Sequence, residues 1–209
     1  RVACSRGLPG HDSSGPVHDA SGVSWPLGKA VRRQLKNVQN VILLGYRGTG
    51  KSSVAELIAL ATNRQVFHMD DEVSRRAGCS IAELARQRGW EAFWALEAQL
   101  VCELAQRNNL VIDTGGGAVR HQEGMEQLKG SGVVFWLTAS PHTIKHRIRE
   151  EPHRPPLTAG KSFLDEVEEV LQAREPLYAQ YADYVVPTDG RTLGEIAQEI
   201  IEIVCLNTP

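Results

Sequence analysis

The feature that most constrains the fold of this 209-residue chain is the stretch GYRGTGKSS, residues 45–53. It follows the apolar run NVILL and precedes VAELIALAT, which has a helical pattern. Gly45, Gly50, Lys51 and Ser52 complete the P-loop pattern, in which a glycine-rich loop joins a strand to a helix. The motif and its context therefore predict a buried strand, a tight loop and a helix in succession.

A loop of this kind is suited to holding phosphate. Its glycines let successive backbone N–H groups point at phosphate oxygens, and the dipole of the helix that begins near Lys51 adds a favourable potential. We expect Lys51 to reach the β- and γ-phosphates of a nucleoside triphosphate and Ser52 to ligate Mg²⁺. A glycine-rich turn without a ligand is the competing interpretation. The loop residues predicted to bind the nucleotide are Arg47, Gly48, Thr49, Gly50, Lys51, Ser52 and Ser53.

Short apolar segments alternate with helical patterns from Asn37 onward. We predict strands at 41–44, 65–69, 110–113, 133–137 and 184–186, and helices at 51–61, 81–88, 91–107, 141–149, 163–182 and 193–204. This alternation is typical of βαβ crossovers, which build a parallel sheet with helices on both faces. The predicted fold class is therefore α/β, a P-loop kinase fold with a five-stranded parallel sheet sandwiched by helices and ligands beyond the carboxyl ends of the strands.

Residues 1–36 differ in composition from the rest of the chain. They are rich in Gly, Ser, Pro and His and lack a sustained period, so we predict a flexible tail or linker before one domain at 37–209. A targeting remnant or a linker from a larger polypeptide is the alternative. Six Lys or Arg against two Asp give the tail a charge of +4, and the other seventeen basic and twenty-three acidic residues give the domain −6. A negative domain is a poor nucleic-acid binder.

Other features of the sequence narrow the class further. No apolar run approaches the roughly 18 residues that span a bilayer, so we expect no membrane partner. The four cysteines are scattered without a CxxC pair, which is typical of reduced thiols in a cytoplasmic protein. The absence of an NKxD-like guanine-reading segment after the fourth strand argues against a GTPase. The length that remains after the tail suits a small-molecule kinase that uses ATP and Mg²⁺, and we expect a monomer.

Acidic residues follow the second predicted strand, in the sequence FHMDDE at 67–72. A carboxylate at this edge of the sheet can hydrogen-bond the hydroxyl of an acceptor and orient it for in-line attack on a phosphate. Any of these acids can instead be a solvated residue in the first turn of a helix, where the dipole favours negative charge. We prefer that interpretation for Asp71 and Glu72.

Three later features are candidates for the same site. Gly115, Gly116 and Gly117 follow the third strand and allow a ligand to approach the backbone closely, although a tight turn is the competing account. Arg154, in the Pro- and Gly-containing segment 150–162, is suited to a lid that stabilises charge on the transferred phosphoryl group, or it is a solvent-facing loop residue. Arg174 can bind an anionic substrate or neutralise nearby acids such as Asp183.

The P-loop, the acid at the end of the second strand, TGGGAV, RPPL and REPLY at these separations resemble the shikimate kinase family, over about residues 38–204. The resemblance implies transfer of the γ-phosphoryl group of ATP to the 3-hydroxyl of shikimate, with a small substrate-binding helical region and a lid loop added to the sheet. It implies that Asp70 engages the acceptor hydroxyl and that Gly115, Gly116 and Gly117 line the substrate. It implies further roles for Arg174 against the substrate carboxylate, Arg154 as the lid arginine and Arg147 against adenine, with residues 188–191 on the other side of that base.

Two positions depart from the family pattern. The family usually has Asp-x-Asp where this chain has His68-Met69-Asp70, and the first of those acids helps to hold Mg²⁺. Mg²⁺ prefers carboxylate oxygen to imidazole, so we hypothesise that Asp113, at the end of the third strand, supplies the missing carboxylate.

The second departure is Trp94, where the family has an arginine that binds the substrate carboxylate. An indole has one N–H donor and no charge, so it cannot replace a guanidinium. Trp94 is either core packing, with a nearby arginine such as Arg75 or Arg88 taking over, or a change of pocket for a different alcohol. The alternatives are therefore a related kinase with another hydroxylated substrate and a non-catalytic nucleotide-binding module.

Overall fold

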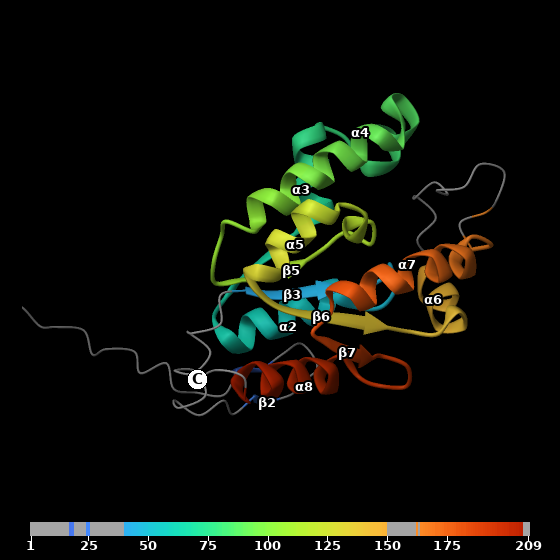
Figure 1. Cartoon of the computed structure of the whole chain (residues 1–209). Coiled ribbons are helices and arrows are strands. Elements are labelled where there is room, and N and C mark those ends of the chain that lie inside the picture. Colours follow the sequence, from blue (N-terminus) through green and yellow to red (C-terminus); the bar gives the residue numbers. More distant parts are fainter. Residues whose placement is uncertain (1–16, 19–23, 26–39, 150–161, 163, 207–209) are drawn as a thin grey trace, which may run out of the picture.

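The computed structural model describes residues 17–18, 24–25, 40–149, 162 and 164–206. Within these residues, five parallel strands form one sheet in the order β4-β5-β3-β6-β7 (Figure 1). The strands are β3 (Asn40–Leu44), β4 (Gln65–His68), β5 (Leu110–Asp113), β6 (Gly132–Thr138) and β7 (Tyr184–Pro187). The predicted five-stranded parallel sheet is confirmed, and the strand that leads into the P-loop is at its centre.

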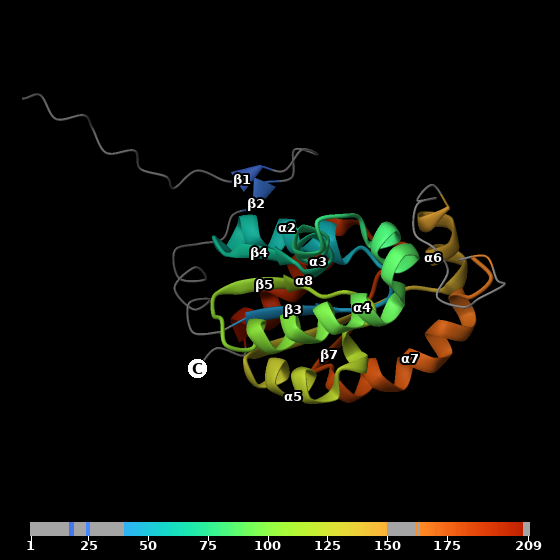
Figure 2. The ribbon, with the colours of Figure 1, turned by 90° about the horizontal axis from the view of Figure 1, so that it is seen from above.

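Helices cover both faces of this sheet (Figure 2). One face packs against α2 (Lys51–Thr62) and α8 (Leu193–Leu206), and the other against α4 (Ile81–Leu104), α5 (Gln122–Gly130) and α7 (Val167–Tyr181). Side chains of a strand alternate between faces, so Val41 and Leu43 join the core under α2 and α8, while Ile42 and Leu44 join the opposite core. Burial on both faces explains why β3 is a continuous apolar run.

Two short helices were not predicted from the sequence, α3 (Met69–Ala77) and α5. Both are only nine residues long and contain few apolar residues, so each offers a helical pattern little more than two turns in which to be recognised. Tertiary packing holds them, because Met69 of α3 and Met125 of α5 are fully buried in the core. The predicted strand at 65–69 is consequently wrong by one residue, since Met69 begins α3 instead of ending β4.

The helices predicted at 81–88 and 91–107 are two parts of one kinked element, α4. Gly89 has φ 78° and ψ 166°, outside the helical region, so the break lies where the two predicted helices were separated. The element begins at a capping box in which the Ser80 hydroxyl accepts a hydrogen bond from the Glu83 N–H and the Glu83 carboxylate accepts one from the Ser80 N–H. It ends at Leu104, three residues before the predicted end.

Together α3 and α4 form a helical region whose outer end stands away from the sheet (Figure 1). Charged side chains join the two helices. Arg76 of α3 donates to Glu72 at 2.8 Å and to Glu103 of α4 at 2.6 Å, and Arg75 also donates to Glu72 at 2.7 Å. Hydrogen bonds from Arg75 and Arg76 lower the pKa of Glu72 to about 2 from its ordinary value of 4.5.

We therefore expect Glu72→Gln to remove a contribution to stability that depends on pH. A carboxyl whose pKa is lower in the folded than in the unfolded state stabilises the fold above its unfolded pKa, and this stabilisation is lost as pH falls through the folded pKa. Thermal unfolding should show Glu72→Gln melting about 2 °C below the unmodified protein at pH 7, with the difference shrinking between pH 5 and pH 2. A difference that does not change with pH would show that the charge of Glu72 does not contribute.

Part of the predicted tail is also described. Two strands, β1 (Val17–His18) and β2 (Ser24–Trp25), pair antiparallel with each other. They do not test the division into a tail at 1–36 and a domain at 37–209, which stays a prediction. In the described part of the chain, no helix combines the length and the apolar character that crossing a membrane requires.

Candidate active site

The P-loop lies at the carboxyl end of β3 and leads directly into α2. Gly50 precedes the helix in the left-handed conformation, with φ 92°, which glycine adopts without steric cost. Among the described residues no side chain caps the N-terminus of α2, so its first N–H groups and the helix dipole face the loop. This arrangement is a ready site for an anion.

Lys51 is held within this loop. Its side chain is 8% exposed, and its Nζ donates a hydrogen bond to the Tyr46 carbonyl at 3.0 Å. The same carbonyl accepts a hydrogen bond from the Thr49 hydroxyl at 2.7 Å. The ammonium group is thus fixed at the loop that leads into α2.

Arg147, from α6 (Pro141–Ile148), ties the loop to the end of β7. Its guanidinium donates to the Gly48 carbonyl at 3.1 Å and to both the hydroxyl and the carbonyl of Thr188, each at 3.1 Å. Arg147 and residue 188 were expected on the two sides of adenine. The structure brings them together beside the P-loop, and the adenine contact itself stays a prediction.

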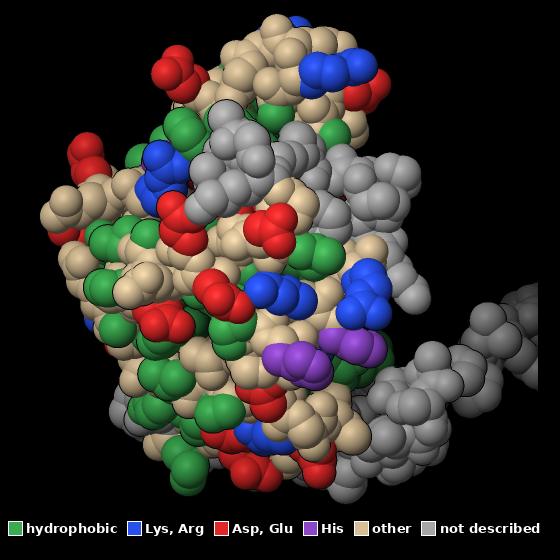
Figure 3. Space-filling view, turned by 90° about the vertical axis from the view of Figure 1, so that its right-hand side faces the viewer, with side chains coloured by type: hydrophobic (Ala, Val, Ile, Leu, Met, Phe, Trp, Pro, Cys, Tyr) green, Lys and Arg blue, Asp and Glu red, His purple; other side chains and the backbone are tan. Residues whose placement is uncertain are grey.

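A pocket of about 530 Å³ opens at the edge where β3, β4 and β5 end. Figure 3 faces this side of the molecule, where basic side chains lie among acidic ones. The residues that line the pocket are Arg47, Gly48, Gly50, Lys51, Ser52, Ser53, Glu56, His68, Asp70, Asp71, Asp113, Thr114 and Gly116. The pocket therefore combines the P-loop with the acids predicted after the second and third strands and with the glycine loop.

His68 forms the centre of a charged cluster in this pocket. It is the register partner of Asp113 on the neighbouring parallel strand, and its Nδ1 lies 2.9 Å from Asp113 Oδ2. Its Nε2 lies 2.9 Å from Glu56 Oε1 on α2. Burial lowers the pKa of His68, but the hydrogen bonds and charges of Glu56 and Asp113 raise it above the ordinary value of 6.5. The imidazole therefore holds Asp113 in position at the end of β5.

The glycine loop after β5 packs against two carboxylates. A Cβ at Gly115 would collide with Glu97 Oε1 and would lie 3.1 Å from Asp70 Oδ1, so only glycine fits there without a shift. Glu97 of α4 is 1% exposed, and its Oε2 lies 3.0 Å from His121 Nε2. The close approach supports the functional interpretation of this loop over a plain tight turn, because it brings Asp70 to the loop.

Arg174 reaches the same loop from α7. Its Nη1 donates to the Gly116 carbonyl at 2.7 Å, and the side chain is 9% exposed. The Tyr178 hydroxyl donates to the same carbonyl at 2.7 Å, and burial raises the pKa of Tyr178 to about 12. Asp183, the alternative partner for Arg174, instead accepts a hydrogen bond from the Val134 N–H at 2.9 Å. Arg174 is thus a buried cation at the glycine loop.

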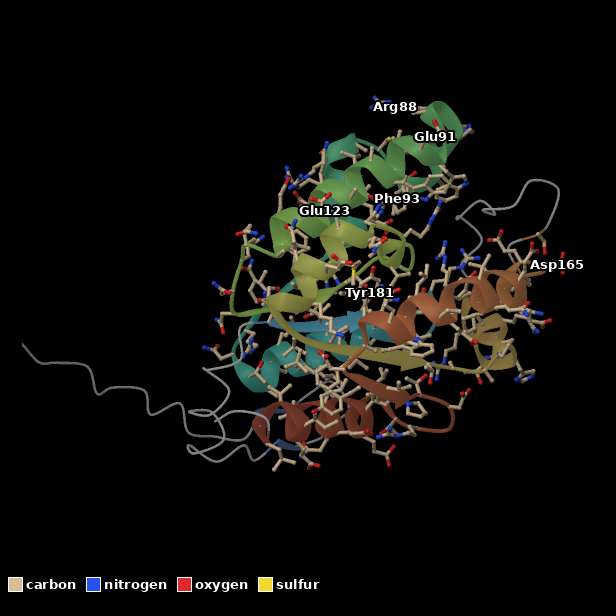
Figure 4. The ribbon with its side chains drawn as sticks, in the orientation of Figure 1. Arg88, Glu91, Phe93, Glu123, Asp165 and Tyr181 are labelled. Carbon is tan, nitrogen blue, oxygen red and sulfur yellow. The ribbon has the colours of Figure 1, made fainter. Side chains whose placement is uncertain are left out.

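Trp94 lies in the core-facing part of α4, half-buried against the cluster that contains Phe93 and Leu84. Neither arginine proposed to replace the family's clamp residue lies at Trp94. Arg75 pairs with Glu72, and Arg88 is at the outer end of the helical region (Figure 4). The guanidinium that does contact Trp94 is that of Arg120, whose Cζ lies 3.8 Å from the centre of the indole ring.

Residues that the sequence did not single out complete the site. Glu56 and Thr114 line the pocket, and Glu97 supports the glycine loop. Glu56 lies on α2, four residues after Ser52, and belongs to no sequence motif, so its role depends on the contact with His68. Arg154, predicted to be the lid arginine, lies outside the described residues, as does nearly all of the segment 150–162.

The described residues fit a nucleoside triphosphate with Mg²⁺. The start of α2 and Lys51 offer donors for phosphate, while the Ser52 hydroxyl and the Asp113 carboxylate are oxygen donors of the kind that Mg²⁺ prefers. In the described ranges, no three or more His, Cys, Asp and Glu side chains group in a way that could hold a metal by themselves. Mg²⁺ in nucleotide sites is commonly bound through one or two protein groups together with phosphate oxygens and water.

Comparison with known proteins agrees with this geometry. Residues 47–205 match the family model of shikimate kinase. The shikimate kinase of Symbiobacterium thermophilum is 38% identical over 78% of this chain and 94% of its own length, and that of Thermodesulfovibrio yellowstonii is 34% identical over 79% and 94%. The solved structure of shikimate kinase from Acinetobacter baumannii in complex with shikimate matches 84% of this chain and 98% of its own, with a TM-score of 0.78 and 28% identity. The chain therefore belongs to the shikimate kinase family.

Proposed function

We propose that this protein transfers the γ-phosphoryl group of ATP to the 3-hydroxyl of shikimate. The observation that carries the proposal is the convergence of Asp70 and Arg174 on the glycine loop 115–117, beside the pocket that Lys51 lines. Asp70 can accept a hydrogen bond from the hydroxyl of the acceptor, and Arg174 can bind its carboxylate. Both side chains thus flank one loop, next to a phosphate site. Membership of the shikimate kinase family supports the same activity.

On the nucleotide side, the chain supplies positioning and positive charge. The N–H groups at the start of α2 hold phosphate oxygens, and Lys51 places its ammonium beside them, where it stabilises charge that develops on the transferred group. Ser52 and Asp113 are the residues that would hold Mg²⁺, and bound Mg²⁺ supplies neutralisation of phosphate charge. Arg154, the predicted lid arginine, would add to this stabilisation of charge on the transferred group.

On the acceptor side, Asp70 accepts a hydrogen bond from the hydroxyl and orients its oxygen toward the phosphate. Arg174, which contacts the neighbouring residue Gly116, holds the carboxylate of the acceptor. Fixing both ends of a small rigid acid converts random encounters into one geometry suited to in-line attack. Asp70 is in the first turn of α3, so its position depends on the packing of that helix against the core.

The direct test is release of ADP from MgATP, coupled to a spectrophotometric readout, with shikimate and with other hydroxylated acids at matched concentrations. We expect release that requires shikimate and yields a phosphate monoester detectable by ³¹P NMR. ADP release that requires a different hydroxylated acid would favour the related kinase. ATP binding without any acceptor-dependent release would favour the non-catalytic nucleotide-binding module.

The Mg²⁺ site makes a prediction that separates Asp113 from His68. Asp113→Asn should lower activity about 100-fold at 1 mM Mg²⁺ and recover part of it at higher Mg²⁺, because a carboxylate ligand is lost. His68→Asn should have a smaller effect, about tenfold or less, because His68 positions Asp113 and does not hold the metal. Titrations of activity against Mg²⁺ check both. A larger loss for His68→Asn than for Asp113→Asn would contradict the assignment of the ligand.

Two further expectations remain proposals. The scattered cysteines favour a cytoplasmic protein, and a pocket whose described lining residues all come from one chain favours a monomer. Size-exclusion chromatography with light scattering at the concentration of the activity assay would test the second of these.

A further inference from the structure

Two arginines converge on the glycine loop from different elements. Arg174 comes from α7 and donates to the Gly116 carbonyl. Arg120 is the last residue of η2 (Ala118–Arg120), the short turn that follows the loop, and its N–H donates to the Gly117 carbonyl at 3.0 Å. The loop thus fixes where the Arg120 side chain begins and where the Arg174 side chain ends.

The side chain of Arg120 is supported by Trp94. Its guanidinium carbon lies 3.8 Å from the centre of the indole ring, well within the range of a cation–π contact. Trp94 is itself packed against the core under α4, so the ring is a rigid support and not a mobile surface group. A stacked guanidinium keeps its N–H donors in the plane of the group, where they remain available to an anion.

The charges around Arg120 indicate what it faces. Burial lowers the pKa of Arg120, the nearby positive charge of Arg174 lowers it further, and Glu97 raises it. Two arginines are therefore close enough to repel each other, with Glu97 as a nearby acid. Glu97 Oε2 is engaged by His121, and Glu97 Oε1 has no hydrogen-bond partner within the described part of the chain. Arg120 and Arg174 are thus two cations at a loop that also meets Glu97 and Asp70, and a substrate carboxylate can accept hydrogen bonds from both guanidinium groups.

We propose that Arg120, supported by Trp94, is the second arginine that binds the carboxylate of the acceptor, together with Arg174. This inference rests on the proposed function, since it assigns a residue to the same substrate. In this chain Trp94 would then serve as the platform for a guanidinium supplied from the turn after the glycine loop. The tryptophan that stands in place of the family's arginine, and the arginine at position 120, would then be two parts of one carboxylate-binding site.

The test compares Arg120→Ala with the unmodified protein in the ADP-release assay. KM for shikimate should rise about 10- to 100-fold, because a charge-assisted contact to the substrate is lost. The kcat and KM for ATP should change less than about threefold, since a contact made equally in the ground and transition states alters only KM. Arg120→Lys should recover part of the loss, because it restores the charge but not the fork of donors.

Arg107→Ala is the matched control. Arg107 also stacks on an aromatic ring, with its Cζ 5.1 Å from the centre of Phe67, and it does not line the pocket. Its removal should leave KM for shikimate within about twofold. A second readout is the preference for shikimate over its uncharged methyl ester, which Arg120→Ala should reduce by the same factor as it raises KM, whereas a purely structural loss would weaken both substrates equally.

A double variant, Trp94→Arg with Arg120→Ala, returns the guanidinium to α4. It should recover KM for shikimate to within about fivefold of the unmodified protein, which also shows that the site is folded. Shikimate-dependent turnover with unchanged KM and unchanged ester preference in Arg120→Ala would overturn the role of Arg120 and leave the proposed function intact. Absence of shikimate-dependent turnover in the unmodified protein would overturn both.

Discussion

Replacing Lys51 by methionine should lower kcat for phosphoryl transfer about a thousandfold. Lys51 carries the positive charge placed beside the phosphate-binding N–H groups of α2, and losing one such electrostatic group typically costs two to three orders of magnitude in rate, about 10²–10³. Methionine has a similar length and no charge, so it suits a position that is 8% exposed. The measurement is kcat with saturating MgATP and shikimate.

The fold should survive this change. The Tyr46 carbonyl loses the hydrogen bond from Lys51 but still accepts one from the Thr49 hydroxyl at 2.7 Å, so this carbonyl is not left unsatisfied. Lys129→Met is the matched control, because Lys129 pairs with Asp183 at 3.7 Å outside the pocket, and it should keep kcat within about twofold. Activity of Lys51→Met within tenfold of the unmodified protein, at an unchanged melting temperature, would contradict the role of the lysine.

Replacing Asp70 by asparagine should produce the second large effect, a fall in kcat of about 10²- to 10⁴-fold. Asparagine keeps the shape of the side chain, but it loses the negative charge and cannot take the proton of the hydroxyl. The position is constrained, since Asp70 Oδ1 lies close to the glycine loop at Gly115. Affinity for ATP should change little, so binding of a fluorescent ATP analogue should be measured beside kcat.

Glu72→Gln is the control for this variant. Glu72 is in the same turn of α3 as Asp70, but its carboxylate pairs with Arg75 and Arg76 and does not line the pocket. It should reduce stability slightly and leave kcat within about twofold. Equal losses for Glu72→Gln and Asp70→Asn would mean that the charge of α3, rather than Asp70 itself, matters for turnover.

The nucleotide half of the site could be predicted from the sequence because its parts are consecutive. A strand, a loop that contains Gly50, and a helix that starts at Lys51 bring the phosphate-binding groups together by local geometry alone. The parallel sheet could also be predicted, since alternating strands and helices leave few arrangements that bury both faces. Asp70 lines the pocket and Arg174 contacts the glycine loop, while their roles toward the acceptor stay predictions that the resemblance to a family was needed to make.

Other elements were beyond prediction for identifiable reasons. The helix α3 is only nine residues long and buries two apolar residues, Met69 and Val73. Packing of these residues in the core stabilises it more than its local helix-forming tendency does. The stop of β4 at His68 follows from the same packing, because Met69 turns into the core as the first residue of the helix.

Local sequence is therefore enough to predict the P-loop, the alternation of strands and helices along the chain, and the acids and glycines that follow the strands. These features depend on neighbours within a few residues. Two placements could not be read from the sequence and are seen in the folded chain alone. His68 lies between Asp113 and Glu56, and the Arg120 guanidinium lies over the Trp94 ring. His68 is 12 residues from Glu56 and 45 residues from Asp113 along the chain. These contacts therefore depend on strand register and helix packing. Register and packing are properties of the whole core, so no local pattern reveals which side chains they bring together.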